Sequence, residues 1–179
     1  MKNNDDIRWY PMRVTYHREL RIKELLDNLS IENYVPMYYD LADSPEGPHK
    51  MLMPAIHNLI FVHASQEVLT LLKMHRKEFE PMRYMMKTSA DGHTEILYVP
   101  DRQMENFMKV ASMQDESVIF LDARSSSNMG RRVRITAGRF KGIEGVVKRI
   151  KKNKLFLVQI DGVAAVAITY VPADCLEPI

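Results

Sequence analysis

The chain contains one cysteine, Cys175, and it has no run of about 18 consecutive apolar residues, the length needed to cross a bilayer. A single cysteine cannot form a disulfide within the chain, which is typical of a protein in a reducing compartment. The first ten residues, MKNNDDIRWY, place acids where a secretory signal would carry its apolar segment. We therefore expect a cytoplasmic protein that neither crosses nor binds a membrane.

The sequence also lacks the short motifs that accompany common enzyme and metal sites. Six histidines are present, at positions 17, 49, 57, 63, 75 and 93, but none forms an HExxH motif or pairs with cysteines in the spacing of a zinc site. Neither a GxxxxGK[ST] nor a GxGxxG phosphate-binding loop occurs. We therefore expect no catalytic residues, no metal site and no cofactor, and a protein that is not an enzyme.

Charge is distributed unevenly along the chain. Residues 128–179 contain ten basic and four acidic residues, a net charge of +6, whereas residues 1–127 contain fifteen basic and nineteen acidic residues, a net charge of −4. Such asymmetry indicates two modules with different partners. A basic module can meet nucleic acid or an acidic protein face, although excess surface lysine can also serve solubility alone.

Apolar periodicity predicts an α+β domain in the first two thirds of the chain. The expected order is strand, helix, strand, strand, helix, strand and a trailing helix, which is the ferredoxin-like split βαβ arrangement. The first three strands of this order are predicted at 7–15, 33–40 and 59–62, and the last is predicted as a pair, 82–87 and 94–99, joined by a turn at Asp91-Gly92. The helices have apolar faces formed by Ile22, Leu25, Leu26 and Leu29; by Val68, Leu71 and Leu72; and by Met104, Phe107, Met108 and Ala111.

The remaining residues change in character. Periodicity fails over 113–129, which predicts a linker between a domain at 1–112 and a domain at 130–179. In the last segment, short alternating runs are separated by glycines, and Asp161-Gly162 is a strong hairpin signal between two of them. This pattern predicts a small all-β barrel.

Residues 130–147, GRRVRITAGRFKGIEGVV, resemble the KOW motif of NusG-type factors and of some ribosomal proteins. The matching positions are Val133 and Ile135, Gly138 and Phe140, and Gly145 and Val147. In the first half, Trp9-Tyr10 and the run Asn58-Leu59-Ile60-Phe61-Val62 resemble the N-terminal (NGN) domain of the same family.

The chain therefore resembles the NusG/RfaH family of transcription elongation factors over residues 7–179. The resemblance implies an NGN domain at 1–112 and a five-stranded SH3-like KOW barrel at 130–179. Ile56 and His57 stand where the family often has Phe-Pro, and Leu59 stands where it has an aromatic residue. These departures resemble a specialised paralogue of the polysaccharide-operon antiterminator kind.

The resemblance also implies partners for each domain. In the family, an apolar depression on the NGN domain receives the clamp helices of the largest RNA polymerase subunit, and the matching residues here are Tyr10, Ile56, Leu59 and Phe61. For Phe61 a place in the core and a place in the contact are equally expected. The KOW domain is expected to bind termination factor Rho or the ribosomal protein NusE, with Phe140 and Ile143 in an exposed apolar loop.

The nontemplate DNA strand is expected to pass near the first two helices. The basic residues available there for phosphate contacts are Arg18, Arg21, Lys73, Arg76 and Lys77. The overall expectation is a monomeric regulator of transcription elongation or antitermination. The alternative is a ribosome-associated RNA-binding KOW protein, in which the basic module alone binds RNA.

Overall fold

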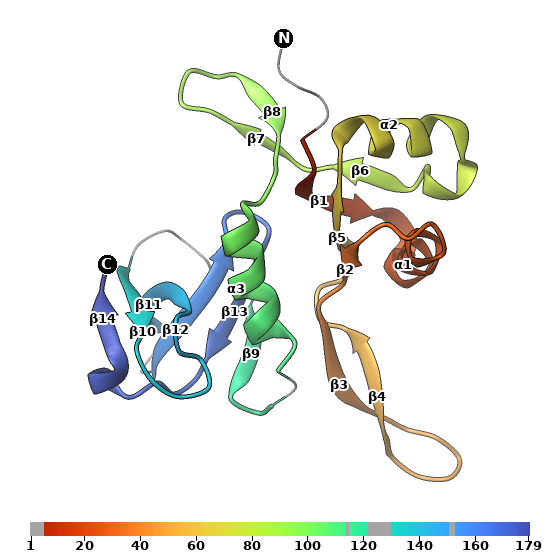
Figure 1. Cartoon of the computed structure of the whole chain (residues 1–179). Coiled ribbons are helices and arrows are strands. Elements are labelled where there is room, and N and C mark those ends of the chain that lie inside the picture. Colours follow the sequence, from red (N-terminus) through yellow and green to blue (C-terminus); the bar gives the residue numbers. More distant parts are fainter. Residues whose placement is uncertain (1–5, 114, 122–129, 151–152) are drawn as a thin grey trace. The chain divides into compact units, whose positions relative to one another are not determined.

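The structure, a computed structural model, describes residues 6–113, 115–121, 130–150 and 153–179 (Figure 1). Contacts divide the chain into two compact units. The first comprises Met1–Pro36 with Pro54–Asp101, and the second comprises Met37–Met53 with Arg102–Ile179. Each unit contains both helix and strand, in agreement with the prediction of an α+β protein. Among the helices of the described residues, none is long and apolar enough to span a membrane.

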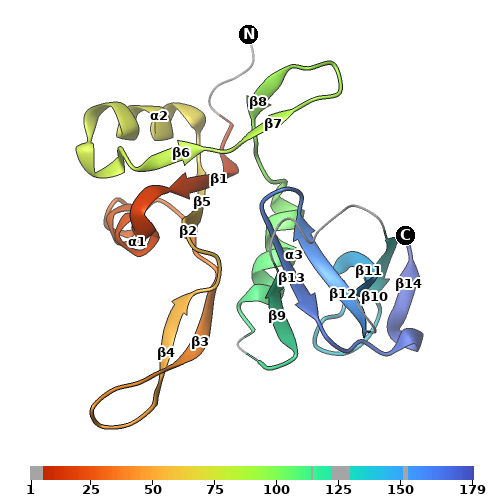
Figure 2. The ribbon, with the colours of Figure 1, turned by 180° about the vertical axis from the view of Figure 1, so that it is seen from behind.

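The first unit is built on a four-stranded sheet with the strand order β2-β5-β1-β6. Helix α1 connects β1 to β2, and helix α2 connects β5 to β6, so that each helix joins two strands that flank a third (Figures 1 and 2). All neighbouring strands in this sheet are antiparallel. The elements are β1 (Arg8–Val14), α1 (Glu19–Asn28), β2 (Asn33–Tyr34), β5 (Leu59–Ala64), α2 (Gln66–His75) and β6 (Met82–Tyr84), with short 3₁₀ turns at Thr15–His17 and Lys77–Phe79 and a further strand pair, β7 (Met86–Thr88) with β8 (Thr94–Ile96).

The pairing register decides which residues share a face of this sheet. Tyr10 lies opposite Val62, and Pro11 lies opposite Phe61. Residues that face each other across an antiparallel pair project to the same side, and successive residues project to opposite sides. Tyr10 and Met12 therefore lie on one face and Phe61 lies on the other.

Helix α2 covers the sheet with a different side from the one predicted. Ser65 caps the helix as its type predicts, by accepting a hydrogen bond from the Val68 amide at 3.2 Å. The buried residue is Leu69, whereas Val68 and Leu71 are 41% and 47% exposed. The predicted face was therefore wrong at Val68 and Leu71, whereas Leu72 is half-buried and lies one turn from Leu69. Helix α2 contains two apolar pairs at i, i+3 spacing, Val68 with Leu71 and Leu69 with Leu72. Only the packing of the helix on the sheet decides which pair faces inward.

The second unit contains a six-stranded sheet with the order β14-β10-β11-β12-β13-β9. Five antiparallel pairings connect these strands. A separate pair of strands, β3 with β4, lies outside this sheet, and β3 takes up the second half of the single strand predicted at 33–40, whose first half is β2. The elements are β3 (Met37–Ala42), β4 (His49–Pro54), α3 (Asp101–Ala111), β9 (Val118–Leu121), β10 (Arg131–Ile135), β11 (Glu144–Ile150), β12 (Asn153–Ile160), β13 (Ala164–Ile168), a 3₁₀ turn at Ala173–Cys175 and β14 (Leu176–Pro178).

The division into units differs from the predicted boundaries at two elements. Strand β9 lies within the predicted linker of 113–129 but pairs with β13, because its apolar run completes an otherwise open sheet edge. The sheet therefore has six strands rather than the expected five. Helix α3, placed by prediction in the first domain, belongs with the second unit, where the Gln103 side chain donates to the Gln159 carbonyl at 2.9 Å. Residues 114 and 122–129 of the predicted linker lie outside the described residues.

Candidate functional site

The four residues predicted to bind polymerase do not form one surface. Leu59 and Phe61 of β5 are buried, and Ile56 is half-buried in the turn that precedes β5. Leu59 pairs with Arg13 and Phe61 with Pro11, so both lie on the face opposite to Tyr10. Leu59 and Phe61 therefore share one face of the sheet, with Ile56 in the turn before them, and Tyr10 lies on the other face.

Tyr10 belongs to the helix-covered side of the sheet. Its ring contacts Tyr84 edge to face, with centroids 5.9 Å apart, and the Tyr84 hydroxyl donates to the Gln66 carbonyl of α2 at 3.3 Å. Burial raises the pKa of the Tyr10 phenol, with Arg8 opposing that shift. Tyr10 is therefore a core residue that helps to seat α2.

A Trp–His pair occupies the other face, beside Phe61, and sequence patterns did not identify it. Trp9 stacks on His63, which lies directly opposite it in the β1–β5 register. The His63 Nδ1 atom lies 2.5 Å from a Glu32 carboxylate oxygen, and the Val99 amide donates to the Trp9 carbonyl at 2.8 Å. The alternation of β1 and β5 could have placed both rings on one face, but only the register made them neighbours.

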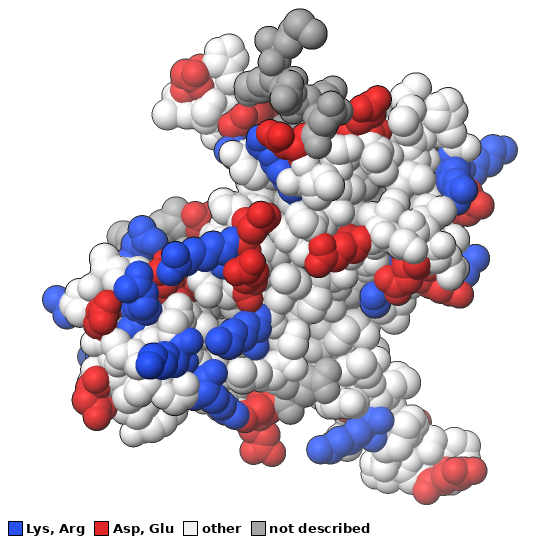
Figure 3. All heavy atoms as spheres, viewed as in Figure 1, with Lys and Arg blue, Asp and Glu red and all other residues white. Residues whose placement is uncertain are grey.

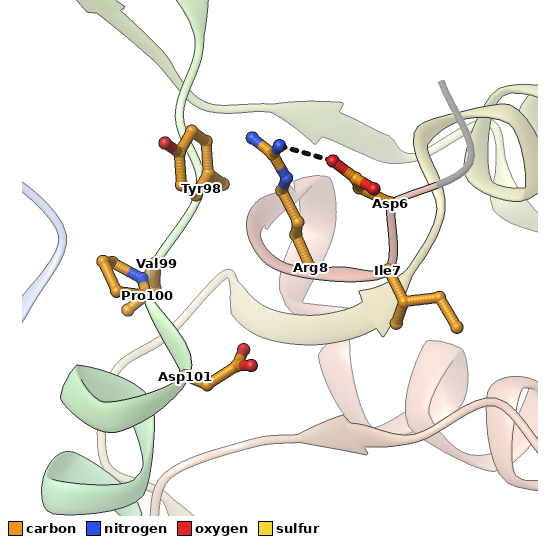
Figure 4. Close-up of a pocket in the computed structure, with 7 residues that line it drawn as sticks. All are labelled: Asp6, Ile7, Arg8, Tyr98, Val99, Pro100 and Asp101. Atoms are coloured by element: carbon orange, nitrogen blue, oxygen red, sulfur yellow. Dashed lines mark hydrogen bonds and ion pairs between the residues drawn. The ribbon is translucent and has the colours of Figure 1, made fainter. Parts of the chain in front are cut away.

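A depression of about 320 Å³ opens at the start of β1 (Figure 4). Arg8 pairs there with Asp6 at 2.9 Å, and its guanidinium carbon lies 4.4 Å from the centroid of the Tyr98 ring. The ion pair with Asp6 raises the pKa of Arg8. Because this charge is already balanced, we assign the depression no ligand. Its lining residues are Asp6, Ile7, Arg8, Tyr98, Val99, Pro100 and Asp101.

The five basic residues predicted to contact DNA differ in how available they are. Arg21 is engaged by Glu24 at 2.6 Å. Lys73 is half-buried, with its ammonium nitrogen 4.7 Å from the centroid of the Tyr84 ring, and desolvation together with nearby Arg83 lowers its pKa. Arg18, Arg76 and Lys77 are exposed at the ends of the two helices. These three are the better placed for phosphate contacts.

Phe140 and Ile143 are not exposed, in contrast to the prediction. They are 7% and 1% exposed, respectively, and the Ile143 amide donates to the Phe140 carbonyl at 3.1 Å. The Arg139 guanidinium covers the Phe140 ring, with its carbon 4.7 Å from the ring centroid. The loop between β10 and β11 folds inward because burial of these two apolar side chains is more favourable in free energy than their exposure to water. They support the loop rather than presenting an apolar contact surface.

Basic side chains gather over the second unit in the left-hand part of Figure 3. Arg134 is neutralised by Glu144 at 2.8 Å and by Glu177 at 3.2 Å, and Arg102 also reaches Glu144 at 2.5 Å. Arg149 lies directly opposite Lys154 in the β11–β12 register, and neither has an ion-pair partner among the described residues. Like charges facing each other across a strand pair are destabilising unless an anion neutralises them.

One group of side chains could hold a metal ion within the described part of the chain. It comprises His17, Glu19 and His57, whose ligand atoms all lie within 4.8 Å of one another. No sequence motif indicates this group, because His57 is distant in the chain from the other two residues and the fold alone brings it to them.

Comparison with known proteins identifies two regions. A family model described as "Transcription termination factor nusG" matches residues 7–108, and another described as "KOW motif" matches residues 129–161. No curated protein matches the chain significantly. Among solved structures, the chain is similar to one described as "Crystal Structure of MjSpt4:Spt5 complex conformation B", with 13% sequence identity over 96% of each chain and a TM-score of 0.28. The nusG match alone spans more than half of the chain.

Proposed function

The chain belongs to the NusG family, and on that premise we propose that it regulates transcription elongation by binding RNA polymerase through its first unit and a second factor through its last. The observation that carries this proposal is the order of the two matched regions, a nusG region at 7–108 followed by a KOW motif at 129–161. We infer that the first unit has the ferredoxin-like arrangement and that the C-terminal sheet closes as an SH3-like barrel.

The proposed polymerase-binding surface lies on the sheet face that carries Leu59 and Phe61. Ile56 stands at its edge and is the residue of this group with the most side-chain surface accessible. Docking of the clamp helices of the largest polymerase subunit would use such an apolar group as its anchor, surrounded by a polar rim. Tyr10 is left out of this surface because the register places it on the helix side.

The departures from the family pattern at Ile56, His57 and Leu59 support a specialised, operon-specific antiterminator rather than a general factor. Exposed Arg18, Arg76 and Lys77 would then contact the phosphates of the nontemplate strand. Phosphate contacts position a protein but do not read sequence, so the choice of operon would depend on other residues.

The direct test is capture of purified polymerase by the full-length protein and by Ile56→Asp. A charge at a buried apolar anchor of an interface commonly costs about 2 kcal/mol or more, so we expect capture to weaken by at least tenfold. Leu71→Asp is the matched control, because Leu71 is an exposed apolar residue of the same unit on α2. Substitutions of Leu59 or Phe61 would test folding instead, since both are buried.

Circular dichroism spectra of both variants must match that of the wild type for the comparison to count. If polymerase ignores the wild-type protein, the proposed function is wrong. If Ile56→Asp and Leu71→Asp bind equally well, the function can stand but the docking surface is misplaced.

A second candidate function is RNA binding by the basic C-terminal unit, as in ribosome-associated KOW proteins. The observation that favours it is the unneutralised pair of Arg149 and Lys154 on neighbouring strands. RNA binding that weakens with salt at a log-log slope of about −0.7 per neutralised phosphate, and that falls in Arg149→Gln and Lys154→Gln, would support this function. Recruitment of Rho or of the ribosomal protein NusE by this unit would instead be measured by titration with each purified protein.

A further inference from the structure

Glu19 is buried in a way that a carboxylate rarely is. It begins helix α1, its residue surface is 1% exposed, and no other charged residue is buried among those the structure describes. Its Oε2 atom has no hydrogen-bond partner in the described part of the chain. A buried carboxylate oxygen without a hydrogen-bond partner is costly, and a cation beside it would remove that cost.

Two histidines supply the other donors. The His57 Nδ1 atom lies 3.7 Å from the Glu19 Oε1 atom, and the His17 and His57 rings meet edge to face with centroids 5.1 Å apart. All three ligand atoms lie within 4.8 Å of one another. Around tetrahedral zinc, ligand atoms about 2.1 Å from the metal are about 3.4 Å apart. Small rotations of the two exposed histidine side chains would therefore complete the geometry.

The backbone holds the two segments that carry these donors together. Asn58 accepts a hydrogen bond from the Val14 amide through its carbonyl, at 3.0 Å, and one from the His17 amide through its side-chain oxygen, at 2.9 Å. Asn58, Tyr16 and His17 all adopt positive φ angles, of 61°, 63° and 52°. Residues other than glycine are rarely held in this region, so the two turns are constrained to bring His17 and His57 over Glu19.

We propose that His17, Glu19 and His57 bind a divalent transition-metal cation of the zinc class. Two imidazoles and one carboxylate suit zinc and its neighbours, whereas magnesium and calcium select sites built from oxygen donors. Three protein ligands leave one position for water or for a ligand from a binding partner. The bound ion would neutralise Glu19 and fasten the β1–α1 turn to the turn that precedes β5.

This inference goes beyond the proposed function and does not depend on it, because it concerns cation binding by the isolated protein. The test is equilibrium dialysis of untagged, full-length protein against zinc, with cobalt(II) absorption in the visible range as a second readout of coordination. Both use a Cys175→Ser background so that the thiol contributes no binding. His57→Gln removes one exposed ligand, Glu19→Gln removes the buried carboxylate with little change of shape, and His75→Gln is the control at an exposed histidine of α2.

We expect one zinc ion per chain and no binding of magnesium. His57→Gln and Glu19→Gln should each lower zinc affinity by at least about tenfold, because even residues that only orient metal ligands cost that much. His75→Gln should bind zinc as the parent does. Circular dichroism of His57→Gln, whose side chain is exposed, confirms that the fold is retained. Absence of stoichiometric zinc binding, or equal affinity in all three variants, would overturn the proposal.

Discussion

The indole ring of Trp9 stacks on the imidazole of His63, with centroids 4.7 Å apart and ring planes 7° apart. Trp9 is the only tryptophan in the chain, and it is buried. Its fluorescence therefore reports on the first unit alone, since the second unit contains no tryptophan. Signals from circular dichroism report on both units, so the two methods together separate their unfolding.

Replacing His63 by alanine should destabilise the first unit by about 1 kcal/mol, because a stacked aromatic pair contributes roughly that much beyond its buried area. The measurement is urea unfolding followed by Trp9 fluorescence. His75→Ala, at an exposed histidine outside the stack, should leave the transition unchanged. Equal midpoints for the two variants would show that the stack does not stabilise the sheet.

Alanine substitutions on α2 should distinguish the side of the helix that packs on the sheet from the side that is exposed. Leu69→Ala should cost about 2–5 kcal/mol, because Leu69 is fully buried and the vacated space would remain as a cavity. Leu71→Ala should change the free energy of unfolding by no more than about 0.5 kcal/mol, because Leu71 is half exposed. The reverse ranking in chemical denaturation would mean that the predicted face, not the observed one, packs on the sheet.

Two glycines of the KOW motif should respond differently to the same substitutions. A Cβ at Gly145 would collide with the Leu157 carbonyl and lie 2.7 Å from the Phe156 ring, so Gly145→Ala should cost about 1–3 kcal/mol and Gly145→Asn more. Gly142 has open space but a φ of +86°, so Gly142→Ala should be destabilising while Gly142→Asn, which adopts such angles more readily, recovers part of the loss. The melting temperatures of the four variants measure this difference. If asparagine were more stable than alanine at Gly145 as well as at Gly142, the proposed difference between the two glycines would be wrong.

The ion pair between Asp115 and Arg139 should make the second unit sensitive to acid. Hydrogen bonds from Arg139 and Ser117 hold the pKa of the Asp115 carboxyl well below its usual range. A folded pKa below the unfolded value, which is about 3.9, adds stability above that pH and loses it as the pH falls toward the folded pKa. Asp115→Asn should therefore lower stability at pH 7 and flatten the acid dependence below about pH 4.

Urea unfolding by circular dichroism at several pH values measures this effect, with Asp174→Asn as the control at an exposed aspartate of the same unit. An acid profile in Asp115→Asn as steep as that of the wild type would assign the sensitivity to other carboxyl groups.

Prediction from sequence succeeded for features that depend on neighbouring residues. The buried stripe of Ile22 and Leu26 and the hairpin strands that flank Asp161-Gly162 both follow from spacings of a few residues. These patterns act within one helix turn or one strand, so the rest of the chain scarcely alters them. The family likewise followed from short motifs read in order.

Prediction from sequence was wrong or incomplete for segments whose local sequence is compatible with more than one packing arrangement. Leu69 rather than Leu71 faces the sheet, Phe140 turns inward from its loop, and the run at Val118–Leu121 completes a sheet edge instead of linking two domains. Each of these segments is compatible with two arrangements that differ little in local preference. The free energy that separates them comes from burial against distant residues, which no window of the sequence contains.

The amino-acid sequence by itself determined the order of the three helices and of strands β1, β5, β6 and β8, the charge difference between the two ends and the membership of the NusG family. Only the tertiary structure placed Tyr10 and Phe61 on opposite faces of one sheet, and brought His57 to the buried carboxylate of Glu19. The reason is physical. Periodicity depends on the geometry of single elements, whereas strand register and contacts between distant turns are set by the packing of the whole unit.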